Sequence, residues 1–186
     1  GMIEKGSAIL FGAVEKFPYA EDDGVMEVMF GARNLTLNFL DGWPDIQELN
    51  ADVRFYNSSL SIDNGEGRTY AAYIEQATVF IPDLDSPVIF VQADITAPAD
   101  DLQKYIWNSG LNDILGDAMS QFQASGKLGL NLSLEIPLDD DSPVKTTGAL
   151  NFDNNELYFP AVGYSINGLS GKLTFTENNL LGSDIV

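Results

Sequence analysis

The side chains that could carry out chemistry in this chain are of few kinds. Its 186 residues include no His and no Cys, which excludes imidazole acid–base catalysis, thiol nucleophiles, disulfides and nearly all zinc or copper sites. Carboxylates, Ser with Lys, and Tyr are the groups that are left. Among 28 Asp and Glu residues, neighbouring carboxylates are expected by coincidence, so composition alone points to no acid–base pair.

Two pairs of carboxylates, Asp83 with Asp85 and Asp153 with Glu156, have the residue types that a glycosidase uses. Such a pair acts only if a cleft holds the two groups about 5 Å or about 7–9 Å apart, and nothing in the sequence marks either pair as buried. The chain also has no nucleophile elbow. We expect no catalytic residues and predict that the protein is not an enzyme.

Acidic runs could form a cation site. Glu21-Asp22-Asp23 and Asp139-Asp140-Asp141 could collect Ca²⁺ through hard oxygen ligands, yet neither has the spaced ligands and the Gly of an EF-hand loop. We expect both runs to be solvated turns that keep the protein soluble. No metal site and no cofactor is therefore predicted.

The overall charge excludes further classes of partner. Nine Lys and Arg residues against 28 Asp and Glu residues give a net charge of −19. A surface this acidic repels phosphate backbones and anionic headgroups, so neither nucleic-acid binding nor electrostatic docking on a membrane is expected. The chain has no run of about 18 apolar residues, so no membrane-spanning helix is predicted. With 45% hydrophobic residues, the chain is too apolar for an acidic disordered segment, and we expect it to fold.

Alternation of apolar and polar residues at period two dominates the sequence and predicts β-strands. It is clearest at 128–138, where six aliphatic side chains share one strand face. Turn residues, among them 63–65 and 154–155, separate the runs. We therefore expect a mostly antiparallel sheet. Shorter runs predict further strands at 8–14, 25–30, 35–39, 49–56, 70–81, 88–95 and 144–152.

One segment has helical spacing instead. Between 98 and 123, apolar side chains recur every three to four residues, Pro98 suits a first helical turn, and Asp100-Asp101 suit its dipole. Ser109-Gly110 indicates a break between two helices. We predict a short helical hairpin at 98–123. Its Met and aromatic residues either pack on the sheet or gate one edge of it.

Short repeats organise the C-terminal third. Similar triplets, each expected to begin a strand, recur at intervals of 22 and 23 residues, starting at Gly126, Gly148 and Gly171. A second repeated pattern predicts hairpins that join 53–55 to Leu60, 150–152 to Leu157 and 173–175 to Leu180. Because one hairpin cannot bury its apolar face alone, stacked hairpins form an elongating sheet. We interpret 1–186 as a single section of a larger repeat-built domain, with hairpin repeats at 126–186.

Several features together resemble a known family. They are Trp43-Pro44-Asp45-Ile46, Phe17-Pro18-Tyr19, 77–82, the helical region around Leu111, and the run Gly-Lys-Leu-Gly-Leu-Asn-Leu-Ser-Leu at 126–134. Their order along nearly the whole chain resembles a central piece of the YhdP branch of AsmA-like proteins. No single feature is a signature of the family, so the resemblance rests on the order in which these features follow one another along the chain.

The resemblance implies a very long protein of a Gram-negative bacterium, anchored in the inner membrane, with a periplasmic β-sheet curled into an apolar groove. Family members carry phospholipid to the outer membrane and so maintain its barrier. The partners implied are phospholipid and the rest of the same long chain, and the inner-membrane anchor would lie outside these 186 residues. The fold expected is α+β and mostly β: a long twisted antiparallel sheet of repeated hairpins forming a groove, with a short helical hairpin insertion.

The function expected is that of a non-catalytic segment of a periplasmic lipid-transfer bridge. The candidate lipid-groove residues are Leu128, Leu130, Leu132, Leu134, Ile136, Leu150, Phe152, Leu157 and Phe159. The alternative is that these side chains form an ordinary sandwich core. The chain would then be a structural or carbohydrate-binding extracellular β-domain, in which Trp43 either stacks on a sugar or fills the core. An outer-membrane barrel fits less well, because aromatic girdles are missing.

Overall fold

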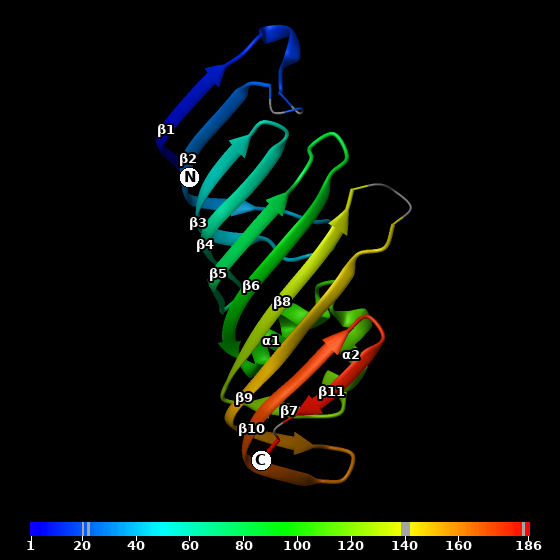
Figure 1. Ribbon diagram of the computed structural model, residues 1–186. Helices are drawn as coiled ribbons and strands as arrows, with labels where there is room; N and C mark the ends of the chain where they lie inside the picture. The colour runs from blue at the N-terminus through cyan, green and yellow to red at the C-terminus, as the bar shows by residue number, and fades with distance from the viewer. Residues whose placement is uncertain (20, 22, 139–141, 184) are drawn as a thin grey trace.

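The computed structural model describes residues 1–19, 21, 23–138, 142–183 and 185–186, leaving aside the side chain of Ala118. In this part of the chain, a single open antiparallel sheet of 11 strands accounts for most residues (Figure 1). The strands are β1 (Met2–Phe11), β2 (Val25–Leu37), β3 (Ile46–Tyr56), β4 (Ser59–Thr69), β5 (Ala72–Ile81), β6 (Val88–Pro98), β7 (Gln123–Ser125), β8 (Lys127–Pro137), β9 (Lys145–Phe159), β10 (Tyr164–Thr176) and β11 (Asn179–Ser183). The mostly β fold expected from the sequence is confirmed.

The strands follow one another across the sheet almost in chain order. The one exception is the insertion between β6 and β8, where β7 leaves the path to pair with β9. This insertion contains α1 (Ala99–Trp107) and α2 (Asn112–Ser120), and a short 3₁₀ turn (Val14–Lys16) lies between β1 and β2. The helical hairpin predicted at 98–123 is confirmed, with its break at Ser109-Gly110.

Several residues predicted to form turns lie inside strands. Asn64 is in β4 and Asn154 in β9, each with positive φ (53° and 55°) beside a shift in strand register. The hairpin expected between 150–152 and Leu157 is therefore wrong, because one strand, β9, runs through both. A β-bulge favours the same residues as a turn, which explains the error. The hairpin from 53–55 to Leu60 is confirmed.

The two repeat triplets at Gly148 and Gly171 do not begin strands either. Gly148 lies within β9 and Gly171 within β10, whereas Gly126 does come directly before β8. The strands predicted at 25–30 and 35–39 are one strand, β2, and β4 was expected only around Leu60, as the second arm of a hairpin. In β2, β4 and β10 a bulge interrupts the alternation that marks a strand in the sequence.

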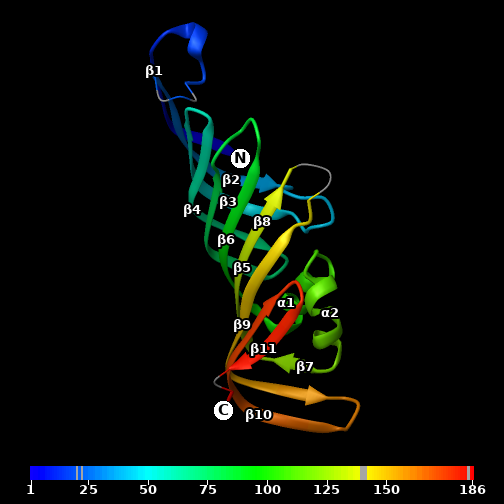
Figure 2. The ribbon, with the colours of Figure 1, turned by 45° about the vertical axis from the view of Figure 1, so that its right-hand side comes forward.

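The bulges of β2, β3 and β4 fall in one stretch of the sheet, and the bulge of β1 lies opposite the residues around Phe30 of β2. Lys5, Asn34, Glu48 and Asn64, on β1 to β4, all have φ between 51° and 53° and mark shifts in register. By contrast, β6 and β8 pair over eleven consecutive residues without a shift. Because a bulge bends a strand and increases its twist, the aligned bulges curve this part of the sheet. Figure 2 shows both helices on one side of the sheet, toward which the β2–β3 connection also extends.

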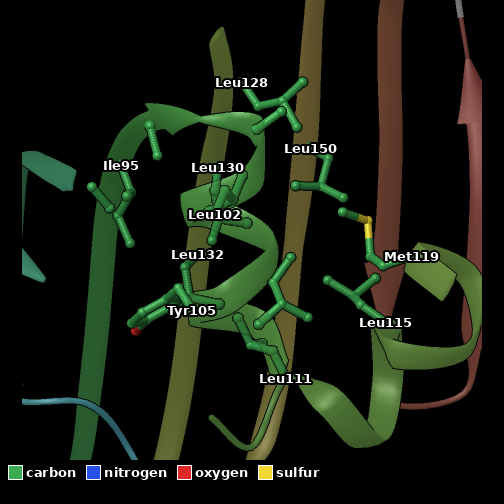
Figure 3. Packing of buried hydrophobic residues seen from close by; sticks show 14 of the residues in the cluster. Ile95, Leu102, Tyr105, Leu111, Leu115, Met119, Leu128, Leu130, Leu132 and Leu150 are labelled. Carbon is green, nitrogen blue, oxygen red and sulfur yellow. The ribbon is translucent and has the colours of Figure 1, made fainter. Parts of the chain in front are cut away.

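The helices bury their apolar side chains against the inner face of β6, β8 and β9. Leu102 and Ile106 of α1, with Leu115 of α2, are fully buried in the same cluster as Leu130 and Leu150 (Figure 3). Each helix has only nine residues and would be marginal in isolation. Packing on the sheet is therefore what stabilises the helical pair.

The substitution Gly148→Ala is expected to lower the free energy of unfolding by about 1–3 kcal/mol. A methyl group at Gly148 would meet the carbonyl oxygen of Asn131 and the ring of Phe175, which fills the space a side chain would need. The matched control is Gly129→Ala on β8, where the nearest atom would lie 3.5 Å away. Urea unfolding of the two variants measures the difference, and equal stabilities would contradict the close contact.

Candidate functional site

Part of the inner face of β2 to β6 and β8 is left uncovered by the helices and forms an apolar groove. Its volume is about 360 Å³. Among the described side chains that line it, polar atoms come from Asn38 and Tyr105, and the amide of Asn38 already donates a 3.1 Å hydrogen bond to Asp45. The lining is otherwise apolar, and it comes mainly from aliphatic residues: Ile46, Leu49, Leu60, Ile62, Ile74, Val79, Ile81, Ile89, Val91 and Ile95.

The strand register aligns these aliphatic side chains in rows across the sheet. One row runs from Ile62 on β4 through Val79 and Val91 to Leu134 on β8, each directly opposite the next. Inner-face residues lie two apart along each strand, so every strand adds one side chain to each row. With strands about 4.8 Å apart, such a row presents a hydrocarbon strip on the floor of the groove.

An aromatic wall closes one end of the groove. Trp43, in the β2–β3 connection, lies 5.6 Å from the ring of Phe39 and 6.1 Å from that of Tyr105 on α1, measured between ring centroids. Phe39 and Tyr105 line the groove, and Trp43 lies behind them with 9% of its surface exposed. A Cβ at Gly110 would lie only 3.2 Å from the indole, so the α1–α2 connection also touches Trp43. We refer to Phe39, Trp43 and Tyr105 as the aromatic wall.

The phenol of Tyr105 is the titratable group most affected by this environment. Burial raises the pKa of the Tyr105 hydroxyl well above its usual value, because the tyrosinate would lose its hydration. In Figure 3 the hydroxyl points away from Leu111, in the α1–α2 connection, and from Leu115 of α2. The phenol is thus neutral at ordinary pH and adds no charge to the groove.

The outer face of the same strands carries most of their polar side chains, together with an exposed pair of rings, Phe80 and Phe90. There the side chains of Asn131 and Asn151 form a ladder with Asp94, through hydrogen bonds of 2.6 Å to Asp94 and 2.8 Å between the two Asn residues. On β2 and β3, the guanidinium of Arg33 donates a 2.9 Å hydrogen bond to Asp52 and holds the pKa of that carboxyl below its usual value. Water therefore solvates one face of the sheet, and apolar side chains cover the other.

The nine residues selected from the sequence fall into two groups. Leu132, Leu134 and Ile136 border the groove, although only 6%, 2% and 3% of their surfaces are exposed. The other six lie away from the groove. Phe159 packs on Phe122, with ring centroids 6.1 Å apart, and the remaining five are buried in the cluster that the helices share: Leu128, Leu130, Leu150, Phe152 and Leu157. Contact of any of the nine with lipid stays a prediction.

Sequence reasoning missed most of the groove lining, which comes from β3 to β6. Ile62, Val79 and Val91 are half-buried and more accessible than the β8 residues. Their signal was present as alternation in the sequence, but bulges interrupt it in β3, β4 and β5. The alternation is longest and uninterrupted in β8, so most of the candidate residues were selected there instead.

The residues considered for catalysis or metal binding are not gathered into a site. Asp83 and Asp85 lie in the β5–β6 turn, where the carboxylate of Asp83 accepts a 3.0 Å hydrogen bond from the Asp85 amide. Asp153 and Glu156 are exposed on β9. Within the described ranges, no group of three or more Asp and Glu residues could hold a metal ion. Asp22 and the run at 139–141 lie outside the described residues.

The substitution Tyr105→Phe is expected to reduce the loss of stability at alkaline pH. The folded-state pKa of Tyr105 is raised, so above about pH 10 the phenol ionises in the unfolded chain first, and folding loses up to about 1.4 kcal/mol per pH unit. The Phe variant has no phenol to ionise and therefore avoids this loss of stability. Urea unfolding of both proteins between about pH 9 and about pH 11 measures the difference in slope; parallel pH profiles would show that the phenol is not buried.

Comparison with known proteins identifies the family. A family model described as YhdP protein matches residues 1–186. The intermembrane phospholipid transporter YhdP of Escherichia coli (strain K12) is 27% identical over 180 residues, which cover 97% of this chain and 14% of that protein. No solved structure matches the chain. No helix in the described part of the chain is long and apolar enough to cross a membrane. Because the family model extends over its whole length, this chain belongs to the YhdP family.

Proposed function

We propose that this chain is a non-catalytic section of a phospholipid-transfer protein, in which acyl tails lie on the apolar inner face of the sheet while headgroups stay in water. The observation that carries the proposal is the groove itself: an aliphatic floor on β3 to β6 that the protein's own helices leave open. The relative from Escherichia coli is named as an intermembrane phospholipid transporter, which supports lipid as the occupant.

The energetics of tail binding agree with such a groove. Moving an acyl chain of roughly 16 carbons out of water is worth about 13 kcal/mol, at about 0.8 kcal/mol per CH₂. A carrier must supply apolar surface of that order without holding the tail at one point. Rows of similar side chains, such as Ile62, Val79 and Val91, offer repeated contacts of nearly equal strength. We infer that a tail can move along this floor.

We assign different roles to the residues selected from the sequence. Leu132, Leu134 and Ile136 would form one side of the groove and touch the tail directly. Residues such as Leu130 and Leu150 would act indirectly, by holding α1, the helix that carries Tyr105. The open floor for the lipid is then β3 to β6 together with this border on β8.

The wider setting follows from the family and from the size of the chain. We propose that the groove belongs to the periplasmic part of a longer, inner-membrane-anchored chain of a Gram-negative bacterium, and that the neighbouring sections of that chain are its main partners. The chain spans about a seventh of the length of its curated relative, so one groove would be a section of the path between the two membranes.

The structural and carbohydrate-binding alternatives gain less support. Trp43 is 9% exposed and packed between Phe39 and Tyr105, so it offers no free ring face to a sugar. A purely structural β-domain would have no reason to keep an open aliphatic floor, because burying it would add stability. Lipid binding accounts for both features.

The substitution Val91→Asp is expected to remove most of the phospholipid that co-purifies with the chain. A carboxylate at this half-buried position would place a charge beside the tail and cost several kcal/mol of desolvation. Native mass spectrometry and lipid extraction measure the bound lipid. The matched control is Gln92→Asp, one residue along β6 on the exposed outer face, which should retain it. A lipid-free wild-type chain, or equal loss in both variants, would contradict the proposal.

A further inference from the structure

The groove differs at its two ends along the direction of the strands. One end is closed by the aromatic wall, where Phe39 and Tyr105 line the groove. At the other end, β5 and β6 lead into the turn at 82–87, in which Asp85 and Ser86 are exposed to water. A phospholipid has the same polarity, with a hydrated head and an apolar tail end. The groove can therefore accept a lipid whose tail lies parallel to the strands and ends at the wall.

The groove is deep enough in this direction to hold an acyl tail. From Ile89 to Ile95, both of which line the groove, β6 advances six residues, or about 20 Å at about 3.3 Å per residue. The tails of one bilayer leaflet span about 15 Å, half of a hydrocarbon core of about 30 Å. A tail of that length thus fits between the open rim and the wall, with about 5 Å to spare.

The perpendicular direction, across the strands, is less favourable for a tail. Beyond β8 the rows lose their aliphatic side chains: Leu134 lies opposite Thr146, and Leu132 lies opposite Gly148. The ring of Phe175 occupies the space above Gly148. A tail crossing the sheet would therefore meet a hydroxyl and a filled position at β9, whereas a tail parallel to the strands stays on aliphatic floor.

We propose that the aromatic wall is a ruler that sets the longest acyl tail the groove accepts. The proposal rests on the proposed function and specifies which lipids the groove selects. Phe39 and Tyr105 would meet the terminal methyl of the tail. Trp43 is a positioning residue, because it lies against both rings and links the β2–β3 connection to the helical pair. Among the described residues, the Trp43–Tyr105 pair is the only aromatic contact between the β2–β3 connection and the helices.

The test uses the purified chain and vesicles that contain equal amounts of dimyristoyl, dipalmitoyl and distearoyl phosphatidylethanolamine, with bound lipid identified by native mass spectrometry. Phe39→Ala removes a half-buried ring from outside the strands and deepens the groove. The mean tail length of the bound lipid should rise by about two carbons relative to wild type. The control is Trp107→Ala, which truncates an exposed side chain of α1.

A second variant tests the opposite direction and guards against a wall variant that does not fold. Ala93→Phe adds a ring halfway down the groove, where Ala93 is flanked by Ala77 and Leu132, and should shift the bound lipid to shorter tails. Its control, Gln92→Phe, places the same ring on the outer face. Circular dichroism checks that each variant is folded.

The outcomes separate the ruler from the function on which it rests. Opposite shifts in tail length for Phe39→Ala and Ala93→Phe, with both controls like wild type, would support the ruler. Unchanged tail-length distributions in folded variants that still bind lipid would overturn it while leaving lipid binding intact, because the tail would then lie across the strands. A wild-type chain that takes up no lipid from the vesicles would reject lipid binding and the ruler together.

Discussion

The inner face of the sheet carries more aliphatic surface than two nine-residue helices can cover. That mismatch is the physical constraint on which the structure depends. The helices bury the half of the face around Leu130 and Leu150, and this burial supplies the main hydrophobic core. The half around Ile62, Val79 and Val91 stays open as a groove. Core and groove are thus two parts of one apolar surface, and the edge of α1 is the boundary between them.

Curvature is what turns this surface into a groove. An apolar face on a flat sheet would be exposed along its whole length and would promote association with other chains. The aligned bulges at Asn34, Glu48 and Asn64 bend β2 to β4 around the same side as the helices. The β2–β3 connection then reaches α1, where Trp43 contacts Tyr105. The result is a trough with one closed end, while the acidic and amide side chains of the outer face remain in water.

Much of the architecture could be predicted from local sequence pattern. Strict alternation at β8 and helical spacing at 98–123 both correspond to observed elements, because each pattern reports which side of one element is apolar. Bulges were the main source of error. Asn64 and Asn154 adopt a left-handed conformation within continuous strands, and the same residues would serve equally well in a turn. Whether the chain reverses there depends on strand pairing, which no short segment specifies.

The sequence by itself determined that one face of a long antiparallel sheet is aliphatic, that two short helices interrupt it, and that the chain has no imidazole or thiol chemistry. Only the tertiary structure decided which aliphatic residues are core and which line the groove. Leu128 on β8 and Val91 on β6 are both aliphatic and both face inward, yet Leu128 is fully buried in the core and Val91 is half-buried on the floor of the groove. The physical reason is that burial depends on where a distant segment docks, and that position is set by packing between residues far apart in the chain.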